Sequence, residues 1–589
     1  MVRLRALPRL GRRVWARLVE RAALKEWDEG GVLMAFGVAI GVAVGLAVVA
    51  FYRLVDLAYF AFAEFPARRL DVLGNALYRP VLTAAGLWAA WLVVRRLRLP
   101  DGQNVPDVQL AVAKRGGEVP LRPVAGRTVA AAVTLGSGGS AGSEGPVAVL
   151  GAALGSSLGR LFRFDGRHRK ILVGCGAAAG IAAAFGAPFA GAFFALEEVL
   201  GSFSVGAFSP VVVASVVGSI TARAFLGDLP VVDVPAYGGV PPLVVLLLYP
   251  VLGIACGAVS AFYVRVFFGA QALAARTAGP PWLRPLVAGA LVGAVALTAA
   301  SLVTGHGHLR IPMGELAQLT WWALLGLALA KIVMTAATLA GGGSGGVFTP
   351  TLFVGAAFGA GLGALVGQLL PDAGTSVVRW GLVGMAGLIA GATRAPITAI
   401  FMVFEITDDY GLVLPLMLVS VLAYATSLRL APHGLYDGWL ARRGEHLAHG
   451  ADRALMERVR VREAVDRRAA AVPPDASLAD VVAATGRARQ LALPVVDHDG
   501  TLVGVIRYPD LRAALLDRGD LASLLVAMDL AEPTECAAPG DSLRDALRVM
   551  NARAHDALPV VDPTTGRYVG LLARADLLAA YERALLEEV

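Results

Sequence analysis

The stretch of sequence that decides the fold is Thr134-Leu-Gly-Ser-Gly-Gly-Ser-Ala-Gly-Ser-Glu-Gly-Pro146. It returns without a gap as Thr338-Leu-Ala-Gly-Gly-Gly-Ser-Gly-Gly-Val-Phe-Thr-Pro350, and the residues after each proline correspond as well. Each copy predicts a glycine-rich turn that leads into an apolar helix. Glycine-interrupted segments at matching places in two halves of a membrane protein indicate a substrate site near the middle of the membrane.

A second pair of matching segments follows the first pair. Gly186-Ala-Pro-Phe-Ala-Gly-Ala-Phe-Phe-Ala-Leu-Glu197 corresponds to Arg394-Ala-Pro-Ile-Thr-Ala-Ile-Phe-Met-Val-Phe-Glu405, and Leu-Val-Gly recurs upstream of both. Two motifs in the same order indicate that the region is duplicated as a whole. The sequence therefore predicts two related halves.

The composition places these halves in a membrane. Of the 589 residues, 57% are hydrophobic and 16% are charged, well below the roughly 25% charged residues of soluble domains. Charge-free runs such as Gly30 to Tyr52 and Ile332 to Pro371 exceed the ~20 apolar residues that cross a bilayer. This excludes an ordinary soluble enzyme, a disordered chain and a nucleic-acid binder. The three cysteines show no metal or disulfide spacing, and we expect no metal site and no enzyme.

We expect three parts along the chain. Residues 1–29 are dense in Arg but lack a signal-peptide core, which predicts a cytoplasmic amphipathic helix. Residues 30–445 form the membrane part, in halves of roughly 30–235 and 240–445. Residues 446–589 are hydrophilic and acidic and form a cytoplasmic unit. Basic flanks then place both termini on the cytoplasmic side of the cell inner (plasma) membrane, as a multi-pass protein.

The duplicated turns have the physical properties of an anion site. A glycine-rich turn before a helix exposes backbone N–H groups at the positive end of the helix dipole. Pro146 and Pro350 fit the first helical turn, where a missing N–H costs little. Two such helix starts near the membrane centre would bind an anion without a buried cation. The alternative is that the glycines only allow tight helix crossings.

Isolated carboxylates are the candidate functional side chains. An ionised group at the bilayer centre costs at least ~2.5–3.5 kcal/mol, and desolvation favours the protonated form, as a proton carrier requires. Glu197 and Glu405 are equivalent in the repeat, which favours a scaffold role such as hydrogen bonding to helix ends over a direct function. Glu144 and Glu198 stand opposite a phenylalanine and an isoleucine in the other half. These two asymmetric carboxylates are the predicted functional pair.

Four segments together resemble the signatures of the CLC family of chloride channels and chloride/proton antiporters. They are Gly142-Ser-Glu-Gly-Pro146, Gly346-Val-Phe-Thr-Pro350, the Gly-Ala-Pro helix that ends in Glu197-Glu198, and Leu435-Tyr436-Asp437. The resemblance covers roughly residues 30–445. It implies a polytopic α-helical membrane protein with an inverted-repeat fold of about eighteen helices. It also implies a homodimer with a separate anion path in each subunit.

The resemblance assigns roles residue by residue. Glu144 matches the gating glutamate, which competes with anions and exchanges protons with the outside. Glu198 matches the internal glutamate that exchanges protons with the cytoplasm in the antiporters, and Arg127 falls where the family has a basic residue below the anion path. The second turn contributes backbone N–H groups and the tyrosine its hydroxyl. The residues assigned to anion binding are Gln103, Asn104, Gly142, Ser143, Gly145, Gly346, Val347, Phe348 and Tyr436.

Two positions depart from the family pattern. Where the family has Gly-Ser-Gly-Ile-Pro, this chain has Gly102-Gln-Asn-Val-Pro106, so Gln103 replaces the serine that helps to hold the central anion. Glutamine offers amide donors on a longer arm, and it either rearranges the central site or points away from it. Ser143 replaces a usual arginine, which removes a positive charge next to Glu144.

The C-terminal unit contains a second repeat. Ala492-Leu-Pro-Val-Val-Asp497 recurs as Ala557-Leu-Pro-Val-Val-Asp562. Short apolar runs alternate with amphipathic segments, which predicts two β-α-β-β-α units at about 456–520 and 525–589. They resemble a tandem pair of cystathionine-β-synthase (CBS) domains, a cytoplasmic α/β module.

The CBS resemblance implies an adenine-nucleotide site, which is the single cofactor considered for this chain. In the family, a hydroxyl residue contacts phosphate and an Asp three residues later holds the ribose. Asp510 and Asp576 are present, whereas the hydroxyl positions are occupied by Arg507 and Ala573. Arginine can bind phosphate and alanine cannot, so the pair either binds a nucleotide or serves only in dimerisation.

These observations predict transport of an anion, with chloride the first candidate, coupled to proton antiport and gated by a glutamate. The partners are then a small anion, protons, the lipid bilayer and a second copy of the chain, with no nucleic acid. Three alternatives stay open: a passive voltage- or pH-gated anion channel of the same family, an antiporter for fluoride or nitrate, and a divalent-cation transporter with a regulatory CBS pair. The last should cluster acidic residues in its membrane helices, whereas the carboxylates here are isolated.

Overall fold

The computed structural model describes residues 29–66, 78–100, 104–227, 232–235, 237, 243–277, 279–298, 311–371, 374–445, 456–487, 492–516, 524–552 and 555–588. The chain divides into two compact units between residues 447 and 448. Most of the helix predicted over residues 1–29, and the departure at Gln103, lie outside the described residues.

The first half of the membrane unit is helical and mixes long helices with short ones. Its elements are α2 (Glu29–Tyr59), the π-helical η1 (Phe60–Glu64), α4 (Tyr78–Arg96), α5 (Val105–Lys114), α6 (Leu121–Gly136), α7 (Glu144–Leu161), α8 (Gly166–Phe185), α9 (Pro188–Phe194), the π-helical η3 (Ala195–Leu200) and α10 (Val205–Leu226).

The second half repeats this pattern. Its helices are α11 (Leu243–Arg276), α12 (Leu283–Thr298), α14 (Met313–Leu316), α15 (Trp321–Ala340), α16 (Phe348–Leu369), α17 (Val377–Thr393), α18 (Pro396–Thr407), the 3-10 helix η5 (Tyr410–Leu412), α19 (Val413–Leu430) and α20 (Leu435–Ala441). Two short strands, β1 (Val232–Asp233) and β2 (Ile311–Pro312), pair in parallel.

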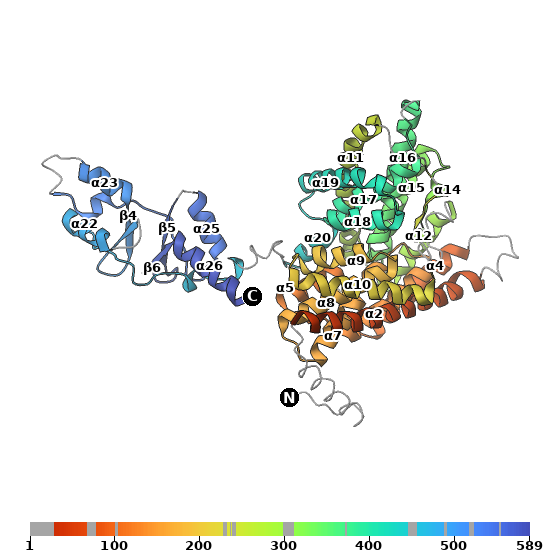
Figure 1. Cartoon of the computed structure of the whole chain (residues 1–589), viewed down its shortest axis with the longest axis horizontal. Helices are drawn as coiled ribbons and strands as arrows, with labels where there is room; N and C mark the ends of the chain where they lie inside the picture. Colours follow the sequence, from red (N-terminus) through yellow and green to blue (C-terminus); the bar gives the residue numbers. More distant parts are fainter. Residues whose placement is uncertain are drawn as a thin grey trace, which may run out of the picture. The chain divides into compact units, whose positions relative to one another are not determined.

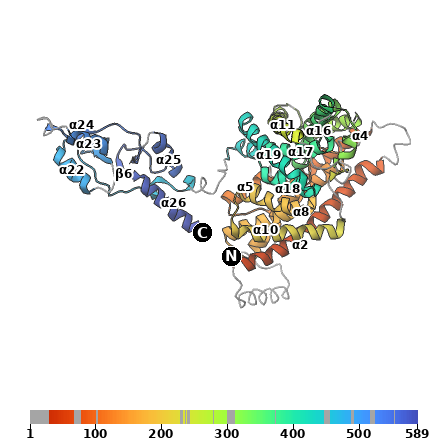
Figure 2. The ribbon, with the colours of Figure 1, turned by 45° about the horizontal axis from the view of Figure 1, so that its top comes forward.

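Four long helices of each half gather together, although α4 of the first half packs on α12 of the second. In Figure 1, α2, α7, α8 and α10 lie on one side of the membrane unit, and α11, α16, α17 and α19 lie on the other. Figure 2 shows the same separation from a second direction. The helix after each glycine-rich turn packs on the helix that follows it, α7 on α8 and α16 on α17. Among the described residues, six helices are long and apolar enough to cross a membrane, and others are shorter.

Helix breaks occur at equivalent places in the two halves. Gly186 ends α8 with φ 68°, and Arg394 ends α17 with φ 70°, both in the left-handed region. The next helix starts at Pro188 or Pro396, where proline suits the first turn. The charge-free run before Glu197 is therefore two helices and not one span.

Many glycines serve close packing and not the turns. A Cβ on Gly151 of α7 would lie 2.0 Å from the carbonyl oxygen of Gly176 on α8. A Cβ on Gly176 would likewise lie 2.0 Å from the carbonyl oxygen of Gly151. In the second half, a Cβ on Gly355 would lie 2.5 Å from the carbonyl oxygen of Gly384. A methyl group fits neither place. The tight-crossing interpretation is thus correct for these glycines, whereas those of the two turns shape the site.

The C-terminal unit contains two copies of one α/β motif. The first copy has α22 (Leu478–Arg487), β3 (Ala492–Val496), β4 (Leu502–Arg507) and α23 (Tyr508–Leu516); a short helix α24 (Ala527–Leu530) follows. The second copy has α25 (Leu543–Ala552), β5 (Ala557–Val561), β6 (Tyr568–Ala573) and α26 (Arg574–Glu588). A 3-10 helix, η6 (Val461–Glu463), lies before the first copy.

Strand pairing is the same in both copies. Strands β3 and β4 pair antiparallel, as do β5 and β6. In each pair the register shifts between the last two residues of the first strand, at Val495/Val496 and Val560/Val561. A parallel bridge precedes each hairpin, Val472 to Val495 and Ala537 to Val560. The first strand of each predicted β-α-β-β-α unit is thus reduced to one bridging residue, and the remaining α-β-β-α order is confirmed.

Candidate functional site

The two glycine-rich turns meet at the centre of the membrane unit. Gly142 and Gly346 form an antiparallel bridge in which each N–H donates to the other's carbonyl oxygen, over 2.8 and 2.7 Å. We expected both glycines among the anion donors, but their N–H groups are engaged in this bridge and so are not available in this conformation. The candidates that remain on the turns are the N–H groups nearer the helix starts.

Side chains from each half also bind the turn of the other half. Ser140 N donates to Thr338 Oγ1 over 3.1 Å, and Ser344 N donates to Thr134 Oγ1 over 3.1 Å. The two bonds are equivalent under the repeat. They fix the turns across the junction, so both halves are required to build one site.

The Glu144 carboxylate occupies the N-terminus of α16. Glu144 is the first residue of α7 and is 1% exposed. Thr349 N donates to its Oε1 and Thr349 Oγ1 to its Oε2, each over 2.7 Å. The Glu144 carboxyl group therefore lies at a helix start of the kind that binds anions.

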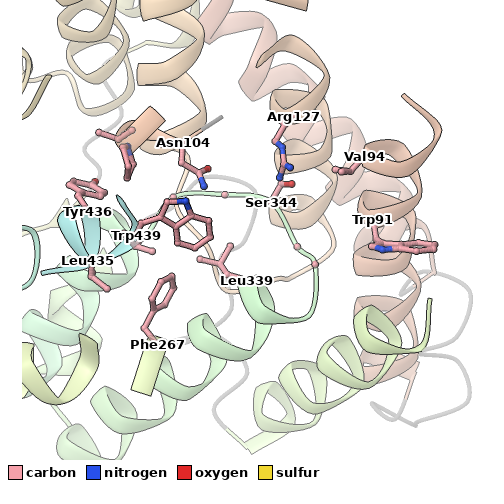
Figure 3. A pocket seen from close by; sticks show the side chains of 18 residues that line it. Trp91, Val94, Asn104, Arg127, Phe267, Leu339, Ser344, Leu435, Tyr436 and Trp439 are labelled. Carbon is pink, nitrogen blue, oxygen red and sulfur yellow. The ribbon is translucent and has the colours of Figure 1, made fainter. Parts of the chain in front are cut away.

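A cavity of about 400 Å³ opens beside this point. Its wall includes the backbone of the second turn, from Gly342 to Val347, and Gly145 of the first. Figure 3 shows the side chains around it: Arg127 and Ser344 lie near each other, Asn104 is central, and Tyr436, Trp439 and Phe267 form an aromatic group. Asn104 stands at the N-cap of α5, and its own N–H donates to Asp107 Oδ2 over 3.0 Å.

Tyr436 is positioned by the start of α20. Asp437 accepts from Gly434 N over 2.6 Å, which caps the helix, and Arg394 donates to its other oxygen over 2.6 Å. Arg394 is the left-handed residue that ends α17, so the helix break and the tyrosine are held by one ion pair. Tyr436 is 7% exposed and lines the cavity.

Glu198 lies on the π-helical turn η3 and is held by α5. Gln109 Nε2 donates to the Glu198 carboxylate over 2.9 Å and to its carbonyl oxygen over 2.8 Å. Since the same helix α5 begins at the cavity, it connects the two places.

Glu197 and Glu405 exchange helix caps between the halves. Glu197 accepts from Ile397 N and Thr398 N at the start of α18, over 3.1 and 2.7 Å. Glu405 accepts from Phe189 N and Ala190 N at the start of α9, over 3.0 and 2.9 Å. The predicted scaffold role, hydrogen bonding to helix ends, is confirmed for both.

Ser143 is buried beside the gate candidate. It is 3% exposed, and its Oγ lies 3.2 Å from the Tyr52 hydroxyl of α2. Two neutral hydroxyl groups therefore lie where members of the family usually have an arginine.

The family model for the voltage-gated chloride channel matches residues 85–428. The chain belongs to this family. A ClcB-like chloride channel protein from Ralstonia nicotianae is 36% identical over 367 residues, which are 62% of this chain and 85% of that protein. The H(+)/Cl(−) exchange transporter ClcA from Cronobacter sakazakii is 33% identical over 419 residues, 67% of this chain and 86% of that protein.

Solved structures agree on the fold. A slow cyanobacterial Cl−/H+ antiporter matches with a TM-score of 0.63 and 22% identity, over 70% of this chain and 97% of that one. A eukaryotic CLC transporter matches with a TM-score of 0.59 and 20% identity, over 92% of this chain and 97% of that one. The predicted CLC fold class is therefore confirmed, and the chain is a multi-pass membrane protein of this family.

The C-terminal unit matches the CBS domain model over residues 461–517 and 528–583, which confirms the second resemblance. Here Arg507 donates to Asp510 Oδ2 over 3.3 Å and also pairs with Glu532. Asp576 Oδ2 is buried without a hydrogen-bond partner. The three residues predicted to bind a nucleotide therefore differ. Arg507 and Asp510 bind each other, whereas one carboxylate oxygen of Asp576 has no hydrogen-bond donor.

Two residues of this CLC site were not foreseen from the sequence. Thr349 follows Phe348 at the helix start and supplies both donors to Glu144. Gln109 supplies both donors to Glu198. In the aligned repeat Thr349 falls opposite Gly145, next to the Phe348 position that matches Glu144, so the alignment alone does not pair the two side chains. Nothing in the spacing of Gln109 points to a partner 89 residues away.

Proposed function

We propose that the chain exchanges a small anion, with chloride the first candidate, for protons across the cell inner (plasma) membrane. The observation that carries the proposal is the buried Glu144 carboxylate on the two donors of Thr349 at the start of α16. A carboxylate and a halide compete for the same N–H groups. The site is therefore either closed by Glu144 or filled by an anion.

The anion would reach this point through the cavity. Backbone N–H groups of Val347 and Phe348 begin α16, and Tyr436 with Asn104 lines the approach. When Glu144 swings away, an anion takes its place at the helix start, and the freed carboxylate can take up a proton. Protonation removes its charge, and with it the competition for the site.

Glu198 would exchange protons with the cytoplasm. It is half-buried, whereas Glu144 is fully buried, and Gln109 donates to its carboxylate over 2.9 Å. Two carboxylates in different surroundings suit proton entry on one side and release on the other. The names of the relatives support this role, since the Cronobacter sakazakii protein is called an H(+)/Cl(−) exchange transporter.

The test is proton movement in lipid vesicles that contain the purified full-length protein. An imposed chloride gradient should drive protons uphill, and Glu144→Gln should keep anion flux while abolishing that proton movement. Glu118→Gln is the matched control, because its side chain is 59% exposed. Anion flux without proton movement in the unmodified protein would refute exchange and identify a passive channel. Substitution of fluoride or nitrate for chloride ranks the anions, and a thermal shift with magnesium tests the cation alternative.

A homodimer with cytoplasmic termini is part of the proposal. Apolar side chains on helices of the membrane unit are exposed in the single chain, including Phe189 on α9, Val205 on α10 and Leu414 on α19. Lipid or a second copy can cover such a surface, and the homodimer implied by the CLC resemblance supports a second copy on part of it. Light scattering in detergent is expected to give twice the chain mass, and a monomer would contradict this.

Binding of an adenine nucleotide by the CBS pair is the last part of the proposed function. The support is the buried Asp576 oxygen without a partner, which a ribose hydroxyl could satisfy. Calorimetric titration of the full chain with AMP and with ATP tests it, with Asp576→Asn as the variant that should lose binding. No heat with either nucleotide would leave the CBS pair as a dimerisation module.

A further inference from the structure

A lysine is buried inside the membrane unit. Lys331 lies in the middle of the apolar helix α15 and is 6% exposed. Its Nζ lies 5.2 Å from the centre of the Phe353 ring on α16. The face of an aromatic ring attracts a cation, but burying a charged side chain in the membrane still costs free energy. A charged residue there therefore indicates a role in an ion path. The roles proposed above make no use of this charge.

The internal repeat identifies the counterpart of Lys331. Matching positions around the two turns differ by 204, as for Pro146 and Pro350. The same offset relates residue 331 to residue 127, so Lys331 is equivalent to Arg127. Arg127 lines the cavity beside the second turn. The chain therefore carries a cation at the same place in both halves.

The two cations flank the glycine bridge from different turns. Lys331 shares one face of α15 with Thr335 and Thr338, four and seven residues later. That face contacts the first turn, because the hydroxyls of Ser140 and Thr335 lie 2.9 Å apart and Ser140 N donates to Thr338 Oγ1. Arg127 instead lies near Ser344 of the second turn. Inverted halves place equivalent residues on opposite sides of the membrane centre.

We propose that Lys331 supplies the fixed positive charge for the part of the anion path beyond the Gly142–Gly346 bridge, on the side opposite the cavity. Arg127 supplies the charge on the cavity side. Because Ser143 beside Glu144 carries no charge, the positive charge for the part of the path beyond the bridge is assigned to Lys331. This role rests on the proposed anion transport and adds a residue that determines anion affinity.

The test compares Lys331→Met with Lys331→Arg in the full-length protein. A unit charge about 10 Å from an anion, at an effective dielectric constant of about 20, changes affinity on the order of tenfold. Lys331→Met should therefore weaken chloride binding about tenfold by calorimetry and raise the KM for chloride, with the saturated flux largely retained. Lys331→Arg keeps the charge and should keep the affinity.

The controls separate charge from packing. Lys114→Met removes a lysine whose side chain is 50% exposed, and it should leave chloride affinity unchanged. Unchanged affinity in Lys331→Met, or an equal loss in Lys331→Arg, would overturn the inference. Lys331→Gln gives the same comparison should the methionine variant fail to fold. Absence of chloride binding and flux in the unmodified protein would instead refute the proposed function.

Discussion

Thr349→Val is expected to open the gate. Thr349 is 4% exposed, and its hydroxyl donates to Glu144 Oε2 over 2.7 Å. Valine has nearly the same volume but no hydroxyl, so one of two donors to the carboxylate is lost. The backbone N–H of residue 349 still donates to Oε1. The substitution therefore weakens the closed position of Glu144 without emptying the site.

The size of the effect follows from the free energy of a hydrogen bond to a charged acceptor. A hydrogen bond to a charged group contributes ~1.5–3 kcal/mol, and each ~1.4 kcal/mol is a factor of ten in equilibrium. Removing the Thr349 hydroxyl should shift the balance from closed to open about 10- to 150-fold. Because an anion must displace the Glu144 carboxylate, apparent chloride affinity should improve by up to this factor. Chloride efflux should also become faster.

Chloride titration calorimetry and efflux from vesicles measure these changes, and a double-mutant cycle isolates the contact. In Glu144→Ala, the acceptor is missing, so adding Thr349→Val should change neither affinity nor flux. Thr351→Val is the matched control, because its hydroxyl donates to Val347 O within the same helix. An equal gain in the Glu144→Ala background would refute the reasoning, since the hydroxyl would then act on something other than the gate.

Further substitutions test the other contacts. Gln109→Leu leaves the Glu198 carboxylate without its amide donor, and we expect proton movement per anion to fall about tenfold with anion flux retained; an unchanged ratio in vesicles would contradict the proton role. Glu197→Gln and Glu405→Gln weaken helix caps, and each should lower stability by ~1–3 kcal/mol in thermal unfolding without changing the coupling ratio. Arg507→Ala removes ion pairs whose side chains are about half exposed. The free energy of unfolding of the CBS unit should therefore change by at most ~1 kcal/mol, and a larger loss would show that the pairs are structural.

The repeat explains how much could be predicted from the sequence. It predicted two halves, glycine turns that meet, and a scaffold role for Glu197 and Glu405, because equivalent residues in inverted halves occupy equivalent structural positions. The fold and the family followed from these patterns. The asymmetric residues Glu144 and Glu198 were singled out by the same comparison, and the structure places one at a helix start and the other beside Gln109.

What the sequence could not predict depends on contacts between distant segments. The charge-free run before Glu197 has the composition of a single transmembrane span. Gly186, however, adopts a left-handed backbone conformation that divides the run into two helices. In the second half, Arg394 adopts the same conformation, which a non-glycine residue rarely does. Its ion pair with Asp437 stabilises it, and no local pattern reveals a partner 43 residues away.

The symmetry of the frame also explains why its chemistry is asymmetric. A pair of identical carboxylates at the two helix starts would repel each other across the Gly142–Gly346 bridge and would block both sides of the path. With Phe348 opposite Glu144, only one start carries an acid, and the other presents N–H groups that Glu144 itself can occupy. The cations need no such difference, because in the proposed roles Arg127 and Lys331 attract the same anion from opposite sides. Under the proposed mechanism, residues that hold the halves together or attract the anion are therefore duplicated, whereas Glu144, which would alternate between closing the site and carrying a proton, occurs once.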